Sequence, residues 1–207
     1  IVYQKVETVS SNAQIEHRAV RGTLRYMDIS DGVELHHDGD LPGRSGLGSS
    51  SSFTVGLLHA LYGLKGMMPS KMQLAQDAIH VEQERLLENV GSQDQVAAAF
   101  GGFNRIDFSS GGLIQVSPVL ADPARLRLLQ DHLMLVYTGI SRTASDVAAE
   151  QIKAMDSKRT ELSAMHQMVD EAMKLLHHSR FLEFGKLLHE YWQLKLSLSH
   201  KISTPHM

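Results

Sequence analysis

The sequence predicts a mixed α/β (α+β) fold, in which sheet and helices share the first two thirds of the chain and helices alone fill the last third. Strand-like alternation and helical spacing interleave up to about residue 140, and only helical spacing follows. A hairpin pattern in the middle of the chain adds sheet to this first part. With 207 residues, of which 43% are hydrophobic, the chain can bury one sizeable core or two small ones.

The hydrophobic periods predict five elements in the first part of the chain. They are a strand over residues 1–9, a helix over 15–27, a short strand over 32–37, and helices over 52–64 and 69–87. Pro69 suits the first turn of the last of these helices, because the N–H that proline lacks would have no helical partner there. The loop ENVGSQD, residues 88–94, follows.

Beyond this loop the patterns predict a hairpin and a series of helices. The segments FNRIDF and GLIQVSPV are strand-like, and the sequence SSGG between them is typical of a hairpin turn. The remaining elements are a helix over 95–100, a helical patch after Pro123, a strand over 132–139 (HLMLVYTG), and helices over 143–155, 160–176 and 180–199.

The run PGRSGLGSSSS, residues 42–52, has the chemistry of a phosphate-binding turn and is called the glycine loop below. Gly46 and Gly48 permit backbone conformations that are closed to other residues, and they let a ligand approach closely. The helix predicted directly after them turns its free N–H groups and positive dipole end toward the loop, where an anion is stabilised. We therefore expect phosphate at the start of this helix.

Other phosphate loops and other chemistries fit this run less well. Gly43 and Gly48 have the spacing of a Walker A loop, but Ser49 stands where a lysine is required, and Ser50 alone cannot supply that charge. A dinucleotide-binding fingerprint requires a third glycine where Ser51 lies. A hydrolase with Ser51 as its nucleophile has little support, because no histidine stands in a recognisable relation to it. An ordinary turn that caps a helix remains the structural alternative.

The segment VEQERLLENVGSQDQ, residues 81–95, supplies carboxylates of the kind that phosphoryl transfer requires. One carboxylate can hold magnesium against a triphosphate, and another can orient or deprotonate the attacking hydroxyl. Glu82, Glu84 and Glu88 fall on a predicted helix and its end, where most acidic side chains are simply solvated. Asp94 closes a glycine-containing loop before an alanine-rich segment, a setting that can fix the position of its carboxylate.

Composition and charge argue against several other classes of protein. A net charge of −3, without a run of lysine or arginine, gives no footprint for nucleic acid. The absence of cysteine excludes disulfides and thiolate metal sites and is compatible with a reducing cytoplasm. No apolar stretch is long enough for a membrane span, so we expect no membrane attachment. The 12 histidines include no pair three or four residues apart, which argues against a zinc helix.

The glycine loop resembles the central motif of the GHMP kinases, the small-molecule kinases that include galactokinase, mevalonate kinase and homoserine kinase. Glu82, Gly91 and Asp94 fall where the galactokinase branch has a glutamate, a glycine and a catalytic aspartate. The segments ENVGSQDQVAAAFGGFNRIDF and TGISRTAS more closely resemble the sugar kinases that act on D-glycero-D-manno-heptose 7-phosphate, in the pathway to nucleotide-activated heptoses. The resemblance implies a partial N-terminal kinase domain over residues 1–120 and a partial, mostly helical C-terminal domain over 121–207.

The resemblance also implies roles for individual residues. Ser50 would ligate magnesium through its hydroxyl, with Glu82 as the carboxylate ligand. Asp94 would accept or orient the proton of the sugar hydroxyl. Arg142 would grip the sugar phosphate, although an arginine that pairs near a helix start is the alternative there. The residues that would contact the ATP phosphates through amides or hydroxyls are Gly46, Leu47, Gly48, Ser49, Ser50 and Ser51.

The expected function is therefore that of a cytoplasmic, ATP- and magnesium-dependent sugar kinase that acts on a heptose phosphate, with a homodimer left open. The GHMP kinases also have an opening motif with a basic residue and a closing glycine-rich motif, and neither pattern is found in these 207 residues. We expect the chain to be the middle of a longer protein. The alternatives are another GHMP sugar kinase, of the galactokinase or fucokinase type, and a nucleotide-binding module without turnover.

Overall fold

The computed structural model describes residues 1–30, 32–40, 46–119, 122–136, 139, 148, 152, 155–199 and 202–203. These residues form two compact units, one up to Gly101 and one from Gly102 onward. Both units contain helices, and the second also contains a two-stranded sheet, so the mixed fold expected from the sequence is confirmed. The domain boundary at residue 120 stays a prediction about the longer protein.

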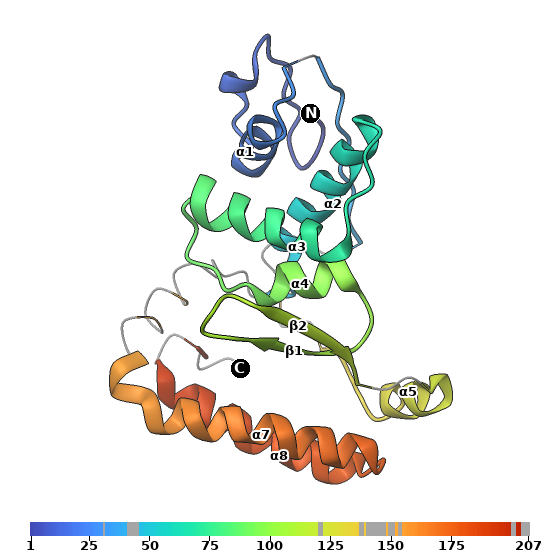
Figure 1. Ribbon diagram of the computed structural model, residues 1–207, viewed down its shortest axis with the longest axis vertical. Helices are drawn as coiled ribbons and strands as arrows, with labels where there is room; N and C mark the ends of the chain where they lie inside the picture. Colours follow the sequence, from blue (N-terminus) through green and yellow to red (C-terminus); the bar gives the residue numbers. More distant parts are fainter. Residues whose placement is uncertain are drawn as a thin grey trace. The chain divides into compact units, whose positions relative to one another are not determined.

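The first unit is built from helices that pack on one another. They are η1 (Asn12–Gln14), α1 (Arg18–Tyr26), α2 (Ser49–Leu64), α3 (Lys71–His80), the π-helical η2 (Val81–Arg85) and α4 (Gln93–Phe100). In Figure 1, α2, α3 and α4 lie against one another, and α1 contacts both α2 and η2. The helices expected in this part of the chain are confirmed, although α2 begins at Ser49, earlier than the predicted start at Ser52.

The core of the first unit is apolar, and α1, α2, α3 and η2 share it. Its buried members are Ile15, Val20, Leu24, Met27, Val55, Leu57, Leu58, Leu61, Leu74, Ala78, Val81 and Leu86. Most of them recur every three or four residues, which places them on one face of each helix. Removal of this apolar surface from water is the main force that holds the helices together.

A buried carboxylate connects α3 to two neighbouring helices. Asp77 accepts hydrogen bonds from the hydroxyl groups of Tyr26 (2.7 Å) and Tyr62 (2.5 Å) and from the side-chain amide of Gln73 (2.8 Å). The hydrogen bond to Asp77, together with burial, raises the pKa of Tyr62 to about 12. The pKa of Tyr26 is also raised, mainly by burial and to a smaller extent by its hydrogen bond to Asp77. Both hydroxyl groups therefore remain proton donors in neutral solution.

We expect the free energy of unfolding to fall as the pH rises above about 10. Folded Tyr62 keeps its proton up to a pKa of about 12, whereas an unfolded tyrosine loses its proton near 10, so the stabilisation disappears between these values. Tyr62→Phe should cost about 1 kcal/mol in neutral solution and make this fall less steep, as measured by urea unfolding. Tyr191→Phe, in the second unit, is the control. Identical pH profiles for wild type and Tyr62→Phe would contradict this account.

Two strands expected in the first unit are not formed. Residues 1–9 and 32–37 make only isolated bridges, one of which pairs Val2 with His36 in parallel. The chain turns back at residues 3–5, where the amide of Tyr3 donates to the carbonyl of Lys5 at 3.0 Å. A regular ladder of hydrogen bonds cannot extend through this turn, so the pairing of these segments stops at isolated bridges. The prediction of strands is therefore wrong for both segments.

The second unit combines a hairpin with helices. Strands β1 (Asn104–Phe108) and β2 (Ile114–Pro118) pair antiparallel, in a register that places Ile106 opposite Val116. The helices are α5 (Pro123–Gln130), η3 (Met155–Lys158), α7 (Arg159–His177) and α8 (Phe181–Leu198). The predicted hairpin, the helical patch after Pro123 and the last two predicted helices are thus confirmed.

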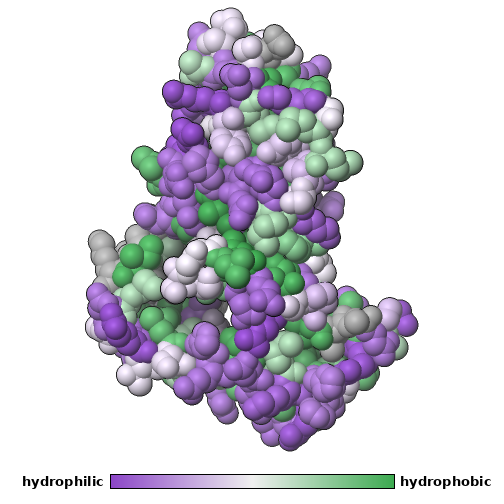
Figure 2. Space-filling view, viewed as in Figure 1, coloured by the Kyte–Doolittle hydropathy of each residue, from purple (hydrophilic) through white to green (hydrophobic). Residues whose placement is uncertain are grey.

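Helices α7 and α8 lie side by side in Figure 1 and make extensive contacts. Leu129 of α5 packs with Leu176 and Phe181 at the point where the two helices meet. Arg105 of β1 donates to Asp170 of α7 at 2.7 Å, which connects the hairpin to the helical pair. On the face shown in Figure 2, the outer surface of this pair is mostly hydrophilic, as expected for amphipathic helices.

The strand predicted over residues 132–139 is wrong for the part that the structure describes. Residues 132–136 form no strand, and the apolar side chains from Leu133 to Val136 are exposed. A strand requires a hydrogen-bonded neighbour, and the sheet in the described residues consists of β1 and β2. Most of the helix predicted over 143–155 lies outside the described residues. No helix in the described part of the chain is both long and apolar enough to span a bilayer.

Candidate active site

The described part of the glycine loop leads directly into α2. Gly46 and Gly48 have positive φ angles of 80° and 68°, and Gly48 is the N-cap residue of the helix. The first hydrogen bond of the helix runs from the amide of Ser52 to the carbonyl of Gly48 at 2.9 Å. The amides of residues 49–51 therefore have no partner within the helix and face the space beyond its end. Residues 42–45 of the loop lie outside the described part of the chain.

The early start of α2 decides which serine faces the interior. Ser51 is 5% exposed, whereas Ser50 is exposed and its carbonyl accepts a hydrogen bond from the hydroxyl of Thr54 at 3.2 Å. Ser51 Oγ donates to a carboxylate oxygen of Glu82 at 2.8 Å. Of these two serines, Ser51 is therefore the one whose hydroxyl group reaches Glu82, whereas the resemblance assigned Ser50 and Glu82 together.

Glu82 lies at the centre of a buried polar network, formed by Glu82, Ser51, Thr54 and Gln95. The carboxylate is 1% exposed and accepts hydrogen bonds from Ser51, from Thr54 Oγ1 at 2.9 Å, and from the side-chain amide of Gln95. These donors compensate for the loss of water around a buried carboxylate. The network therefore connects the first turns of α2 and α4 through the π-helical segment η2.

Two members of this network were not predicted from the sequence. Thr54 lies three residues after Ser51, so both hydroxyl groups are on one face of α2. That spacing is a signal that could have identified Thr54. Gln95 gave no comparable signal, because its contact with Glu82 depends on the packing of α4. The Oε1 atom of Gln95 is buried without a hydrogen-bond partner among the described residues.

Asp94 lies directly against the glycine loop. A Cβ atom added to Gly48 would come within 3.2 Å of both Cγ and Oδ2 of Asp94, so any other residue at this position would push the carboxylate aside by a few tenths of an ångström. Asp94 is in the first turn of α4 and its side chain is exposed, so it is open to a ligand. The structure thus brings together Asp94 and the helix end that the glycine loop precedes.

We expect Gly48→Ala to lower the free energy of unfolding by about 2 kcal/mol. The substitution places a side chain in a left-handed conformation and drives its Cβ atom toward the Asp94 carboxylate. Gly63→Ala is a matched control in the same helix, because its Cβ atom would meet nothing within 4 Å and its φ is not positive. That control should gain about 0.5 kcal/mol, since alanine favours helix over glycine. Urea unfolding measures both, and equal effects would contradict the proposed contact.

The glutamates at the end of α3 and beyond differ in their surroundings. Glu84 is exposed and pairs with His80 at 3.0 Å, as expected of a solvated helical residue. Glu88 is half-buried, and burial is the main cause that raises its pKa, with a further contribution from the charge of Glu82. Arg18 opposes that rise. Glu82 alone of the three is a member of the buried network.

The residues around the helix end fit a magnesium ion only in part. Magnesium prefers oxygen ligands and is usually held by one or two carboxylates together with the phosphates of a substrate. Asp94 is exposed and available, whereas both oxygens of Glu82 already accept hydrogen bonds. Oε2 of Glu82 accepts from both Ser51 and Gln95, whereas Oε1 accepts from Thr54 and retains acceptor capacity, so the burial of Glu82 is what keeps an ion from this carboxylate. In the described residues, no group of three or more histidine, aspartate or glutamate side chains could hold a metal.

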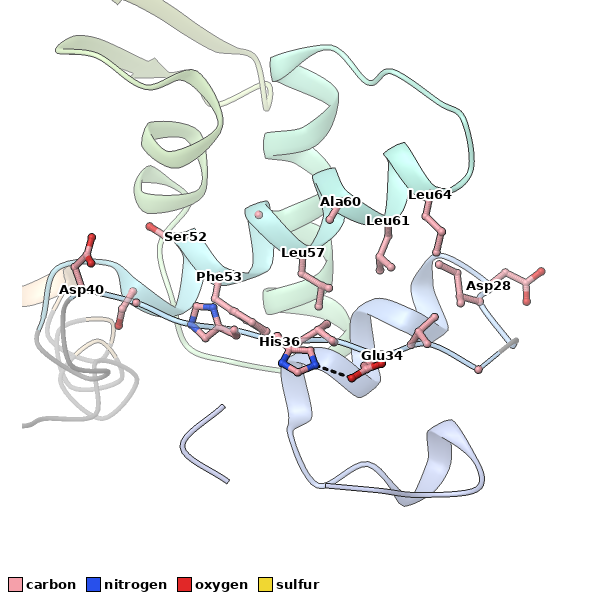
Figure 3. A pocket seen from close by; sticks show the side chains of 18 of the residues that line it. Asp28, Glu34, His36, Asp40, Ser52, Phe53, Leu57, Ala60, Leu61 and Leu64 are labelled. Carbon is pink, nitrogen blue, oxygen red and sulfur yellow. Dashed lines mark hydrogen bonds and ion pairs between the residues drawn. The ribbon is translucent and has the colours of Figure 1, made fainter. Parts of the chain in front are cut away.

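A groove of about 1200 Å³ runs along α2 from its N-terminal end. Figure 3 shows Ser52 and Asp40 near one end of this groove and Leu64 and Asp28 near the other. Its apolar wall is the face of α2 that carries Phe53, Leu57, Ala60, Leu61 and Leu64, and residues from 28–30 and 32–40 form the opposite side. The groove was not predicted, because it forms between two segments that are separate in the sequence.

Histidines line the same groove. His36 contacts Glu34 at 2.8 Å, and the ring of His37 lies 4.7 Å from that of Phe53. His17 does not line the groove, but its ring lies 5.0 Å from that of Phe53, and burial lowers the pKa of His17. These contacts support the interpretation of the histidines as packed or solvated residues. Arg142, the predicted ligand of the sugar phosphate, lies outside the described residues.

Comparison with known proteins shows what this chain is similar to. The D-glycero-alpha-D-manno-heptose 7-phosphate kinase of Campylobacter jejuni is 31% identical over 172 residues, which cover 82% of this chain and 50% of that protein. The L-fucokinase/L-fucose-1-P guanylyltransferase of Bacteroides fragilis is 28% identical over 192 residues, covering 86% of this chain and 19% of the relative. The chain thus spans half the length of the first relative and less of the second.

A solved structure and a family model also match. The crystal structure of a D-glycero-D-manno-heptose 1-phosphate kinase from Bacteroides thetaiotaomicron has a TM-score of 0.69 and covers 93% of this chain and 60% of its own. Its 24% sequence identity supports the fold alone. Residues 14–102 match the family model described as GHMP kinases N terminal domain. This range contains the glycine loop, Glu82 and Asp94, and we conclude that the chain belongs to the GHMP kinase family.

Proposed function

We propose that the protein containing this chain is a sugar kinase that transfers the γ-phosphoryl group of ATP to a hydroxyl group of D-glycero-D-manno-heptose 7-phosphate. The observation that carries the proposal is the position of Asp94, whose carboxylate lies against Gly48 at the N-terminal end of α2. A base and an anion-binding helix end are therefore adjacent, as phosphoryl transfer to a hydroxyl requires. The heptose kinase relative from Campylobacter jejuni supports the choice of acceptor.

Different groups at the N-terminal end of α2 bind the phosphates and accept the proton. The free amides of residues 49–51 donate hydrogen bonds to the phosphates of ATP, and the positive end of the α2 dipole stabilises their charge. Asp94 accepts or orients the proton of the acceptor hydroxyl group. The acceptor oxygen then forms its bond to the γ-phosphorus as the bond from that phosphorus to the β,γ-bridging oxygen breaks, and ADP leaves.

The groove along α2 and the buried network have supporting roles in this proposal. The groove opens at the same helix end as the phosphates and is large enough for the nucleoside part of ATP. Ser51, Thr54 and Gln95 fix Glu82 beneath the loop and so hold the first turn of α2 in place. Magnesium would bind through Asp94 and the phosphates, or through Ser50 and Glu82 after a local shift. When bound, it would neutralise charge on the phosphates.

A panel of acceptors tests the proposed function in the full-length protein. With ATP and magnesium, we expect transfer to heptose 7-phosphate at a kcat/KM at least about 100-fold above that for galactose, fucose or mevalonate, because a site that binds a phosphate loses those contacts with an acceptor that has no phosphate group. Robust transfer to galactose or mevalonate, with none to heptose 7-phosphate, would overturn the substrate. Phosphate release from ATP without an acceptor provides the background rate.

Fucose is the second candidate acceptor. Two fucokinase relatives support it, one from Bacteroides fragilis and a bifunctional fucokinase/GDP-fucose pyrophosphorylase from Arabidopsis thaliana that is 26% identical over 178 residues. Preference for fucose in the same panel would favour this candidate. Binding of magnesium ATP without transfer to any acceptor would instead favour a nucleotide-binding module.

A further inference from the structure

A second cavity in the first unit carries a concentration of positive charge. It has a volume of about 930 Å³ and lies among η1, α1, the residues directly after α1, and the end of η2. Four arginines line it, Arg18, Arg21, Arg25 and Arg85, and we call it the arginine cavity. None of its lining residues belongs to the glycine loop or the buried network, and Asp94 does not line it. On the face shown in Figure 2, the surface over α1 is largely hydrophilic.

The fold gathers these arginines from two elements. Arg18, Arg21 and Arg25 follow one another at intervals of three and four residues along α1, so they share one face of the helix. Arg85 is the last residue of η2, and α1 and η2 are in contact. The convergence therefore depends on the packing of a helix against a π-helical segment far away in the sequence.

Backbone contacts hold two of the guanidinium groups in position. Arg18 Nη2 donates to the carbonyl of Leu86 at 2.7 Å, and Arg21 Nη1 donates to the carbonyl of Ile15. A guanidinium group has five N–H donors, so each of these side chains retains donors for a ligand. A carboxylate partner would neutralise the positive charge of these arginines, but a backbone carbonyl group does not.

The residues that line the arginine cavity carry more positive than negative charge, although the charge of Glu88 also acts on Arg18. The acidic residues that line the cavity are Asp28 and Glu84, and Glu84 already pairs with His80 at 3.0 Å. Among the described residues, none of the four arginines forms an ion pair with a carboxylate within 4.0 Å. The chain as a whole has a net charge of −3, so this positive site is local. Like charges held close together are stabilised when an anion binds between them.

We propose that the arginine cavity binds the diphosphate group of a small molecule, at a site separate from the ATP phosphates at α2. Guanidinium groups bind phosphate oxygens through paired hydrogen bonds, and four of them offer more donors than a single phosphate can use. The volume is in the usual range for sites of small molecules. The proposal does not depend on phosphoryl transfer, because the cavity shares no residue with the catalytic group.

Pyrophosphate is the probe for this site, titrated calorimetrically into the full-length protein. The Gly48→Ala variant distorts the glycine loop and leaves the arginine cavity intact, so binding in this background that is weakened by substitution of the cavity arginines belongs to the second site. In that background we expect Arg25→Gln and Arg85→Gln each to weaken binding about tenfold or more. Arg127→Gln, an exposed arginine of α5, is the control and should bind as the background does.

Several results would overturn the proposal. They are no pyrophosphate binding in the Gly48→Ala background, binding unaffected by Arg25→Gln and Arg85→Gln, and citrate binding as tight as that of pyrophosphate, which would indicate a general anion surface. Arg25 and Arg85 are exposed, so both variants should melt at the same temperature as the Gly48→Ala protein in which they are made. Arg25→Lys provides a second test, since it keeps the charge but loses the paired hydrogen bonds, and binding should still weaken.

Discussion

Asp94→Asn is expected to lower kcat for phosphoryl transfer by a factor of about 10² to 10⁴ in the full-length protein. Asparagine has nearly the same shape as aspartate, so the side chain at residue 94 should still fit close to Gly48. It cannot accept the proton of the acceptor hydroxyl group as a carboxylate does. The affinity for ATP should stay the same or increase, because a negative charge near the phosphates is removed.

The measurement combines steady-state kinetics with calorimetric titration of ATP. Asp156→Asn, an exposed aspartate on η3 in the second unit, is the matched control and should leave both quantities unchanged. An Asp94→Asn protein with wild-type kcat would remove Asp94 from its proposed role. A parallel loss of ATP affinity and kcat would instead indicate damage to the glycine loop.

Glu82→Ala is expected to lower the free energy of unfolding by about 3 kcal/mol or more. The substitution removes the acceptor of the buried donors of Ser51 and Gln95, and it leaves the Thr54 hydroxyl with only its longer hydrogen bond to the carbonyl of Ser50 at 3.2 Å. Each unsatisfied buried donor costs about 1 to 3 kcal/mol, and partial entry of water reduces the sum. Because Ser51 lies in the first turn of α2, the binding of ATP phosphates should weaken as well.

Urea unfolding and ATP titration measure these two effects of Glu82→Ala. Glu84→Ala is the control on the same π-helical segment, and it should cost less than about 1 kcal/mol, since its exposed pair with His80 contributes little. Glu82→Gln keeps one acceptor oxygen and should fall between the two. Equal stabilities of the Glu82→Ala and Glu84→Ala proteins would show that the buried network contributes nothing to folding.

The part of the site that could be predicted from the sequence is the part that depends on local backbone geometry. Gly46 and Gly48 identify the turn, and the apolar helix after them identifies the phosphate-binding end. The pairing of Glu82 with Ser51 instead of Ser50 could not be predicted, because a shift of one residue along a helix turns a side chain by about 100°. The residue at which α2 begins, Ser49, therefore determines which serine side chain points toward Glu82.

The failed strand predictions have a related cause. Alternating side chains over residues 1–9 and 32–37 favour an extended chain, but a strand forms only where a neighbour supplies hydrogen bonds. Helices α3 and α7 depend on bonds within their own segments and were predicted well. The groove along α2 and the arginine cavity join segments far apart in the sequence, so no local pattern signals them.

The π-helical turn of η2 has a consequence for how this segment tolerates changes of length. A π-helix contains a surplus residue relative to an α-helix, and such turns are frequent at functional sites. Deletion of one residue between Val81 and Arg85 would relax the turn and rotate either Glu82 or Arg85 out of register with its partners. Substitution of an exposed residue such as Glu84 is then easier to accommodate on this segment than an insertion or a deletion. The number of residues between Glu82 and Arg85 is therefore fixed by the structure, because Glu82 and Arg85 must each keep their orientation.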